Sequence, residues 1–251
     1  MGKEPKENLK TMSLGEHLEE LRYRLIRALA GAGVGLVACL FFGRYLMRII
    51  ARPYEIAMKI AGLEPEFIAI QPPEKFLVYI KTCLVFGLVI SAPWVFYHIW
   101  AFVSSGLYRH ERKLIYAVAP ASALLFMAGA VFFMVVIAPM AMLFFIKFDT
   151  GINFVRFSST LQNYINLVLA LTLIFALAFQ MPIAIIFAER MGLVSIETLT
   201  SGRRYVILGL VITAAVATPP DVISQIALAI PLYVLFEGSI LICRFLRRRK
   251  K

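Results

Sequence analysis

The sequence predicts an all-α integral membrane protein with six transmembrane helices and no separate soluble domain. Of its 251 residues, 61% are hydrophobic, whereas soluble domains are roughly half apolar. Four apolar runs are each long enough to cross a bilayer, which requires about 20 residues. A fifth and a sixth run near the C-terminus are shorter. Lysine and arginine are also divided unequally between the loops on alternate sides of these runs.

The six predicted spans cover approximately residues 25–43, 76–103, 114–139, 161–188, 205–218 and 222–243. The third and fourth runs exceed one span, and we expect Pro139 and Asn163 to mark where each meets the interface. Prolines 72 and 73, followed by Glu74, favour the start of the second helix. Because the last two runs are each nearer 15 residues than 20, this hairpin is expected to be re-entrant or to span a thinned bilayer.

The distribution of basic residues predicts the orientation of the spans. If the N-terminus is cytoplasmic, 18 of the 26 lysines and arginines lie on the cytoplasmic side and eight lie outside. Cytoplasmic loops are enriched in these residues, which supports two cytoplasmic termini. Six of the eight outer bases lie in or next to the first outer loop, 44–73. This loop is long enough to cover the periplasmic face as a cap, in which Pro53 ends or kinks a short helix.

Several function classes are disfavoured. The net charge of +11 does not indicate nucleic-acid binding, because the bases lie between apolar runs and at the C-terminus. Cys39, Cys83 and Cys243 are isolated, so we expect small buried side chains and neither a disulfide nor a metal site. The serines lack a neighbouring base, the three histidines are scattered, and there is no phosphate-binding glycine loop. We therefore predict no catalytic residue, metal or cofactor.

Acidic side chains stand at the cytoplasmic edge of the first span, in the segment HLEELRYRL (17–25). Leucines at helical spacing form an apolar stripe, and Glu20 lies on another face. By the predicted topology, Glu111 lies on the same side of the membrane. Each acid either pairs with nearby bases, as Glu20 does with Arg24 at i,i+4, or accepts bidentate hydrogen bonds from guanidinium groups of a ligand.

Other polar side chains interrupt the apolar runs. Glu237 lies within the sixth span, where an acid must be paired, protonated or near the interface, so a structural partner and a functional contact both stay open. Gln180 is expected to bond to carbonyls that Pro182 leaves unpaired. Phe102, among other aromatic residues, is well placed to border a groove for an extended apolar peptide.

From Ser13 to about Phe245, the chain resembles the TatC family, the core subunit of the twin-arginine protein translocase. The motifs that carry the resemblance are HLEELRYRL (17–25), SAP (91–93), WAF (100–102) with LYRHER (107–112), and TPPDVISQ (218–225). The resemblance implies a concave, glove-like six-helix bundle with short fifth and sixth helices. It also implies a receptor for signal peptides that carry two consecutive arginines.

The resemblance also assigns roles to residues. Glu20 and Glu111 would contact the arginines, and Leu21, Arg22 and Phe102 would border the same cytoplasmic groove. Thr218 and Gln225 would contact single-span TatA- and TatB-like subunits, and we add Glu237 to these partner contacts. Pro53 and Asp221 would belong to the periplasmic cap. The implied setting is a multimeric complex in the bacterial inner membrane that uses the proton-motive force to move folded cargo.

The chain departs from the family pattern at two places. Gln180 stands where the family typically has glutamate, and Ser105 and Gly106 follow Phe102 where many relatives have proline. A proton-coupled small-molecule transporter would be expected to show internal repeats and several ionisable groups near mid-membrane. An intramembrane enzyme would need a catalytic dyad or metal ligands. The sequence shows neither pattern.

Overall fold

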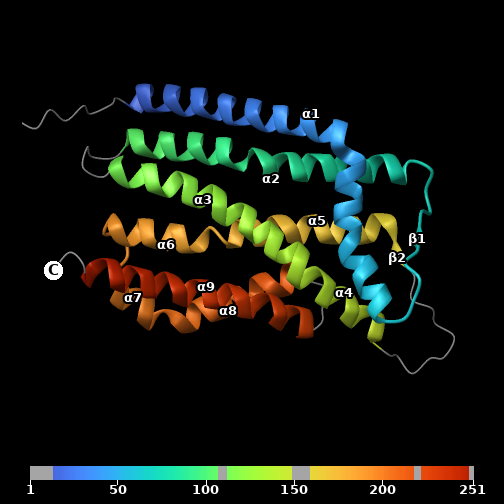
Figure 1. The fold of residues 1–251 in the computed structure, drawn as a ribbon. Helices are drawn as coiled ribbons and strands as arrows, with labels where there is room; N and C mark the ends of the chain where they lie inside the picture. Colours follow the sequence, from blue (N-terminus) through green and yellow to red (C-terminus); the bar gives the residue numbers. More distant parts are fainter. Residues whose placement is uncertain (1–13, 107–111, 149–158, 218–221, 249–251) are drawn as a thin grey trace, which may run out of the picture.

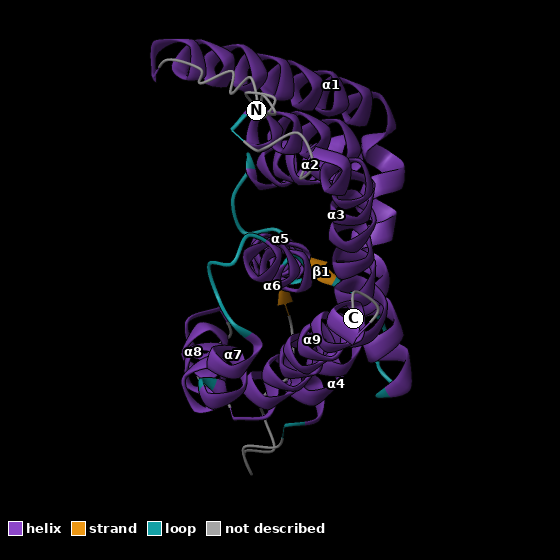
Figure 2. Cartoon of the chain, turned by 90° about the vertical axis from the view of Figure 1, so that its left-hand side faces the viewer, coloured by secondary structure: helices purple, strands orange, loops and turns teal. Residues whose placement is uncertain are grey.

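The computed structural model describes residues 14–106, 112–148, 159–217 and 222–248, which form a bundle of long helices (Figure 1). The helices are α1 (Leu14–Ile60), α2 (Glu74–Ser105), α3 (Arg112–Phe132), the π-helical segment η1 (Phe133–Ile137), α4 (Ala138–Lys147), α5 (Leu161–Ala178), α6 (Met181–Arg190), α7 (Ile196–Ser201), α8 (Arg203–Ala217) and α9 (Val222–Arg248). Two short strands, β1 (Phe67–Ile68) and β2 (Ser159–Thr160), pair in parallel. Viewed end-on, the helices follow a curve with α5 and α6 on its inner side, giving a concave bundle (Figure 2).

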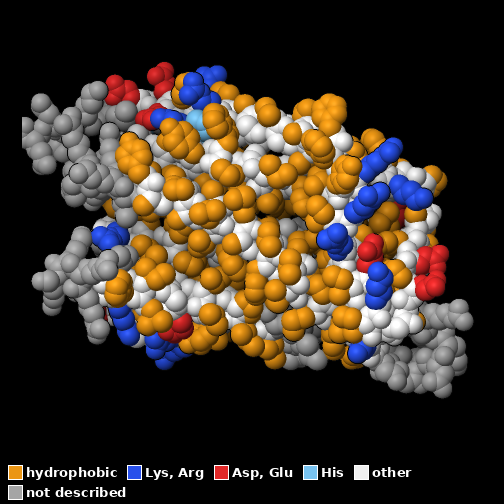
Figure 3. All heavy atoms as spheres, in the orientation of Figure 1, with side chains coloured by type: hydrophobic (Ala, Val, Ile, Leu, Met, Phe, Trp, Pro, Cys, Tyr) orange, Lys and Arg blue, Asp and Glu red, His pale blue; other side chains and the backbone are white. Residues whose placement is uncertain are grey.

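Charged side chains gather at the two ends of the bundle and leave an apolar band between them (Figure 3). We name these ends the Glu20 end and the Glu74 end after one acid at each. Within the described residues, four helices are long and apolar enough to cross a membrane: Gly15–Ile60, Glu74–Ser105, Ile115–Lys147 and Leu161–Arg190. These four overlap the first four predicted spans.

The last two predicted spans correspond to α8 and α9. Helix α8 has 15 residues, as short as its apolar run. Helix α9 has 27 residues and continues through Glu237 to Arg248, so here the apolar run is short although the helix is not. The last turn of α8 and the first turn of α9 both lie well short of the Glu74 end (Figure 1).

Two helix boundaries near prolines differ from the predicted span limits. The predicted third span stops at Pro139, whereas the helical run of α3, η1 and α4 continues to Lys147. Proline cannot donate to the carbonyl four residues earlier and its ring crowds it, and the π-helical turn just before Pro139 accommodates both effects. At Pro182 the helix is interrupted instead, since α5 ends at Ala178 and α6 begins at Met181.

The predicted outer loop 44–73 is largely helical. Helix α1 continues through Pro53 to Ile60, and its last part turns across the bundle at the Glu74 end (Figure 1). Tyr54 is fully buried there and its ring stacks on Phe67 at 4.3 Å. Tyr164, from the start of α5, donates a 2.7 Å hydrogen bond to the carbonyl of Ile50. These contacts attach residues 44–73, which we call the cap, to α5.

Glycines set the distance between α1 and α2. A Cβ atom at Gly35 would lie 2.8 Å from the carbonyl oxygen of Gly87, and one at Gly87 would lie 2.8 Å from Leu36 Cα. These distances are shorter than van der Waals contact to backbone atoms, which cannot move aside locally. Only glycine therefore allows this crossing.

We expect Gly35→Ala to destabilise the protein by about 1–3 kcal/mol, the usual cost of overpacking. Gly33→Ala is the matched control, because nothing lies within 4 Å of a Cβ at that position of the same helix. The measurement is thermal unfolding of both purified variants in detergent. Equal unfolding temperatures would contradict the close crossing.

Candidate functional site

The first turns of α1 and the last turns of α2 lie side by side at the Glu20 end because the two helices run antiparallel (Figure 1). Contacts along the pair fix their register. Trp94 Nε1 donates a 2.8 Å hydrogen bond to the carbonyl of Arg27, and Tyr79 donates a 2.6 Å one to the carbonyl of Leu40. Side chains from residues 17–27 of α1 and 94–106 of α2 therefore lie next to one another at the Glu20 end.

Glu20 is a poorly satisfied carboxylate within this place. Its side chain is 20% exposed, and its Oε1 atom lies 3.4 Å from Nη2 of Arg24, well beyond the usual 2.7–2.9 Å of a charge-assisted hydrogen bond. Its other oxygen, Oε2, is buried and has no hydrogen-bond partner among the described residues. The i,i+4 pairing expected from the sequence therefore exists, but it is weak and leaves acceptor capacity unused.

Phe102 lies at the same end, and its ring stacks on His17 at 4.6 Å between centroids. A Cβ at Gly106 would lie 3.8 Å from the same imidazole ring. Leu21 is 38% exposed and Arg22 is exposed, so both are available at the surface beside Glu20. The structure thus brings four of the predicted groove residues to one end of the α1–α2 pair.

Glu237 contrasts with Glu20 because both of its oxygens are used. Arg203 contacts Oε1 through Nε at 2.8 Å and donates to Oε2 through Nη2 at 2.9 Å. Tyr233 donates a 3.0 Å hydrogen bond to Oε1. Each oxygen of Glu237 therefore accepts one hydrogen bond, and Oε1 also lies in ion-pair contact with Arg203. Glu237 therefore has a structural partner that joins α8 to α9.

The remaining predicted site residues are distributed as follows. Gln225 on α9 donates a 3.0 Å hydrogen bond to the carbonyl of Val211 on α8. Pro53 is buried in the cap. Glu111, Thr218 and Asp221 lie outside the described residues.

Gln180 forms a different hydrogen bond from the one predicted. Its Nε2 donates at 2.9 Å to the carbonyl of Ser122 on α3, and not to carbonyls next to Pro182. The hydroxyl of the same serine accepts a 2.8 Å bond from Trp100 Nε1 on α2. The break between α5 and α6 turns Gln180 toward α3, so it links separate helices rather than repairing its own.

Two polar groups with tight or unusual surroundings were not singled out from the sequence. Glu74, treated there only as a helix-start residue, is 1% exposed and accepts three backbone hydrogen bonds. His98, dismissed as one of three scattered histidines, is 2% exposed and faces α1. The antiparallel register of the first two spans was the signal that could have placed His98 opposite the Glu20 segment.

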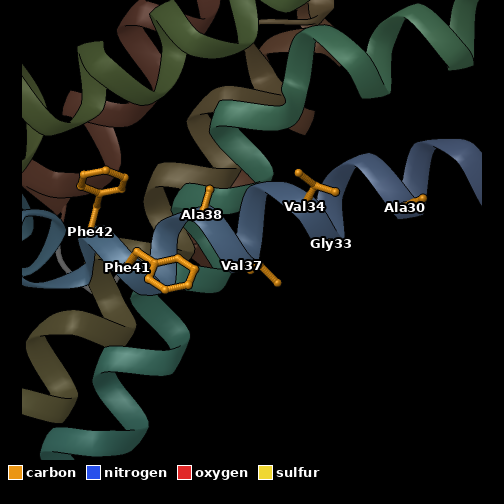
Figure 4. A pocket seen from close by; sticks show the side chains of 7 residues that line it. All are labelled: Ala30, Gly33, Val34, Val37, Ala38, Phe41 and Phe42. Atoms are coloured by element: carbon orange, nitrogen blue, oxygen red, sulfur yellow. The ribbon is translucent and has the colours of Figure 1, made fainter.

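No described feature indicates metal or small-molecule chemistry. No group of three or more His, Cys, Asp or Glu side chains in the described ranges is arranged to hold a metal ion. A shallow groove follows the outer face of α1, and its lining is entirely apolar (Figure 4). It is lined by Ala30, Gly33, Val34, Val37, Ala38, Phe41 and Phe42. Phe41 is 83% exposed, as suits a face in contact with lipid.

Comparison with known proteins gives one consistent family. The family described as "Sec-independent protein translocase protein (TatC)" matches residues 16–231. Proteins named "Sec-independent protein translocase protein TatC" are similar over nearly the whole chain. The one from Desulforapulum autotrophicum is 37% identical over 94% of this chain and 85% of its own length. The one from Escherichia coli K12 is 34% identical over 94% of this chain and 89% of its own length.

Solved structures agree with the sequence comparison. A crystal structure titled "Twin Arginine Translocase Receptor- TatC in DDM" superposes with a TM-score of 0.78 at 32% identity, and covers 90% of this chain and 99% of that one. A second crystal structure of such a receptor gives a TM-score of 0.76 at 34% identity, with 92% and 99% covered. The similarity therefore extends to the arrangement of the helices.

Proposed function

This chain belongs to the TatC family of Sec-independent protein translocase proteins, and we propose that it binds twin-arginine signal peptides at the Glu20 end. The observation that carries the proposal is the state of Glu20. One of its oxygens is buried with no hydrogen-bond partner among the described residues, and the other is held at only 3.4 Å. A carboxylate in this state is a ready acceptor for an incoming cation.

The geometry of the acceptor favours arginine over lysine. A guanidinium group offers parallel N–H donors that match the two oxygens of a carboxylate, whereas an ammonium group acts as a point charge. Phe102 and Leu21 beside Glu20 supply apolar contact for the residues that flank the arginines in an extended peptide. Glu111 is proposed as the second arginine receptor, and Arg22 as a further residue at the border of the groove.

The wider setting follows from the family and from the charge distribution. We place both termini in the cytoplasm and the protein in the bacterial inner membrane, so that the Glu20 end faces newly made cargo. The role is binding and assembly rather than catalysis. TatA- and TatB-like single-span subunits would complete the complex, with Thr218, Gln225 and Glu237 near their contacts and with Pro53 and Asp221 in the periplasmic cap. The proton-motive force would supply the energy for moving folded proteins.

Peptide binding tests this proposal directly. The purified full-length chain is titrated with a fluorescent signal peptide that carries Arg-Arg and with one that carries Lys-Lys. We expect the wild type to bind the Arg-Arg peptide more tightly than the Lys-Lys peptide. Glu20→Gln should lower the affinity for the Arg-Arg peptide by roughly 10- to 100-fold, as expected for a lost charge-assisted pair. Glu111→Gln should have a similar effect.

Glu19→Gln is the matched control, because Glu19 is adjacent in sequence but exposed. It removes the same charge without removing the buried acceptor, so it should bind both peptides like the wild type. Equal binding of the two peptides by the wild type, or equal losses in Glu19→Gln and Glu20→Gln, would refute the assignment.

A further inference from the structure

His98 is a buried polar side chain whose hydrogen-bonding capacity is unused. It is 2% exposed, and neither Nδ1 nor Nε2 has a hydrogen-bond partner among the described residues. The rings of Trp94 and Tyr97 pack edge-on against it at 4.7 and 5.3 Å. Burying a polar group without a partner is costly, so most such groups in proteins are satisfied. An unsatisfied imidazole therefore calls for a ligand or a second state.

The α1–α2 register places His98 opposite Glu20 and Arg24. On one side along α2, Phe102 stacks on His17. On the other side, Trp94 bonds to the carbonyl of Arg27. His98 lies between these two contacts on α2, as residues 20–24 do on α1.

Three side chains between α1 and α2 at the Glu20 end each have buried polar atoms without hydrogen-bond partners among the described residues. We call Glu20, Arg24 and His98 the buried polar cluster. Oε2 of Glu20, Nε of Arg24 and both ring nitrogens of His98 are buried and unpartnered in the described part of the chain. The cluster holds a single hydrogen bond, the 3.4 Å contact between Arg24 and Glu20. It therefore has more donors and acceptors than it uses in this state.

We propose that His98 is a positioning residue of the signal-peptide site, which accepts the guanidinium group of Arg24 when an incoming arginine takes Arg24's place on Glu20. The inference rests on the proposed function. Arg24 occupies Glu20 in the free protein as an internal substitute for the ligand. Once displaced, its partly buried guanidinium needs a new acceptor, because an unpaired buried charge is strongly unfavourable. A ring nitrogen of neutral His98 supplies that acceptor.

The exchange explains two features together. Arg24 is held loosely enough at 3.4 Å to be displaced, and His98 keeps an acceptor free for it. A shorter pair such as Arg203–Glu237, with contacts of 2.8 and 2.9 Å, could not be opened as easily. The cluster thus keeps Glu20 occupied and shielded until the correct cation arrives.

A double-mutant cycle on peptide binding tests the exchange. His98→Phe keeps the ring and removes the acceptor, so we expect Arg-Arg peptide affinity to fall about 10-fold. His98→Gln retains an acceptor and should restore most of the affinity. Arg24→Met removes the internal competitor and should bind the peptide more tightly than wild type. In the Arg24→Met background, His98→Phe should have no further effect.

The outcomes separate this inference from the proposed function. Suppose the wild type prefers the Arg-Arg peptide and needs Glu20 to bind it. The inference is then overturned if His98→Phe binds this peptide like the wild type. It is also overturned if His98→Phe lowers the affinity by the same factor in the wild-type and Arg24→Met backgrounds. It is also overturned if His98→Gln is as weak as His98→Phe. If His98→Phe does not fold, Arg24→Met decides: tighter binding supports the exchange, and unchanged or weaker binding overturns it. Loss of Arg-Arg preference in the wild type removes both proposals.

Discussion

Replacing Glu74 with glutamine, an isosteric change, should lower the unfolding temperature of the purified protein by several degrees. Oε2 of Glu74 accepts from the backbone nitrogens of Ile70 at 2.8 Å and Gln71 at 3.3 Å, and Oε1 accepts from that of Gln162 at 2.7 Å. All three groups are donors, so both oxygens must be acceptors. A glutamine amide points its NH₂ group at one of them, which leaves a donor facing a donor.

The consequence should extend beyond a single hydrogen bond. Glu74 connects the end of the cap to the start of α5, next to the two-residue pairing of β1 with β2. Amide hydrogen exchange should therefore accelerate at residues 67–71 and 159–163 in Glu74→Gln, whereas the centres of α2 and α5 stay protected.

Glu64→Gln is the control, because Glu64 belongs to the same cap and is exposed. It removes an equal charge from the same region without touching a buried acceptor, so its unfolding temperature and exchange should match the wild type. A Glu74→Gln protein as stable as Glu64→Gln would show that the three hydrogen bonds contribute little.

Reversing the charge of Arg203 should also lower the stability of the protein substantially. Reversing the charge of Glu237 as well should restore most of that stability. In Arg203→Glu two carboxylates face each other in a partly buried place beside Tyr233, where 26% of the Glu237 side chain is exposed. We expect a loss of about 2 kcal/mol, below the ~3–5 kcal/mol of a fully buried broken pair. The double variant Arg203→Glu with Glu237→Arg can rebuild the pair and should regain most of the stability.

The same two variants decide between two roles of Glu237. Export of a folded reporter with a twin-arginine signal should be lost in the single variant. Recovery of export in the double variant would mean that the pair only joins α8 to α9. If stability recovers while export stays absent, Glu237 itself contacts a partner subunit. Arg204→Glu, at the exposed neighbouring position, controls for the change in net charge.

The sequence was most informative where one local property decides the structure. Four long apolar helices lie where the sequence predicts the first four spans, because a bilayer requires about 20 apolar residues in a row. The Glu20–Arg24 pair, one of the two alternatives that the sequence left open for Glu20, is present for the same reason, since i,i+4 neighbours meet on any helix. The predictions at prolines were less successful. Pro139 lies inside a continued helix and Gln180 bonds to Ser122, because neighbouring helices decide how a proline is accommodated.

By itself, the sequence therefore determined the class of the protein, the position of its four long apolar helices, and the acidic segment at the edge of the first of them. Only the tertiary structure decided which polar side chains that are distant in the sequence lie next to one another. Glu74 meets Gln162 across 88 positions of sequence, and His98 faces the Glu20 segment because glycines 35 and 87 let α1 and α2 cross closely. The position of each apolar helix can be predicted because the bilayer requires apolar residues in each segment independently of the others. Partners between helices follow from register and crossing, which are set by contacts distributed over the whole bundle.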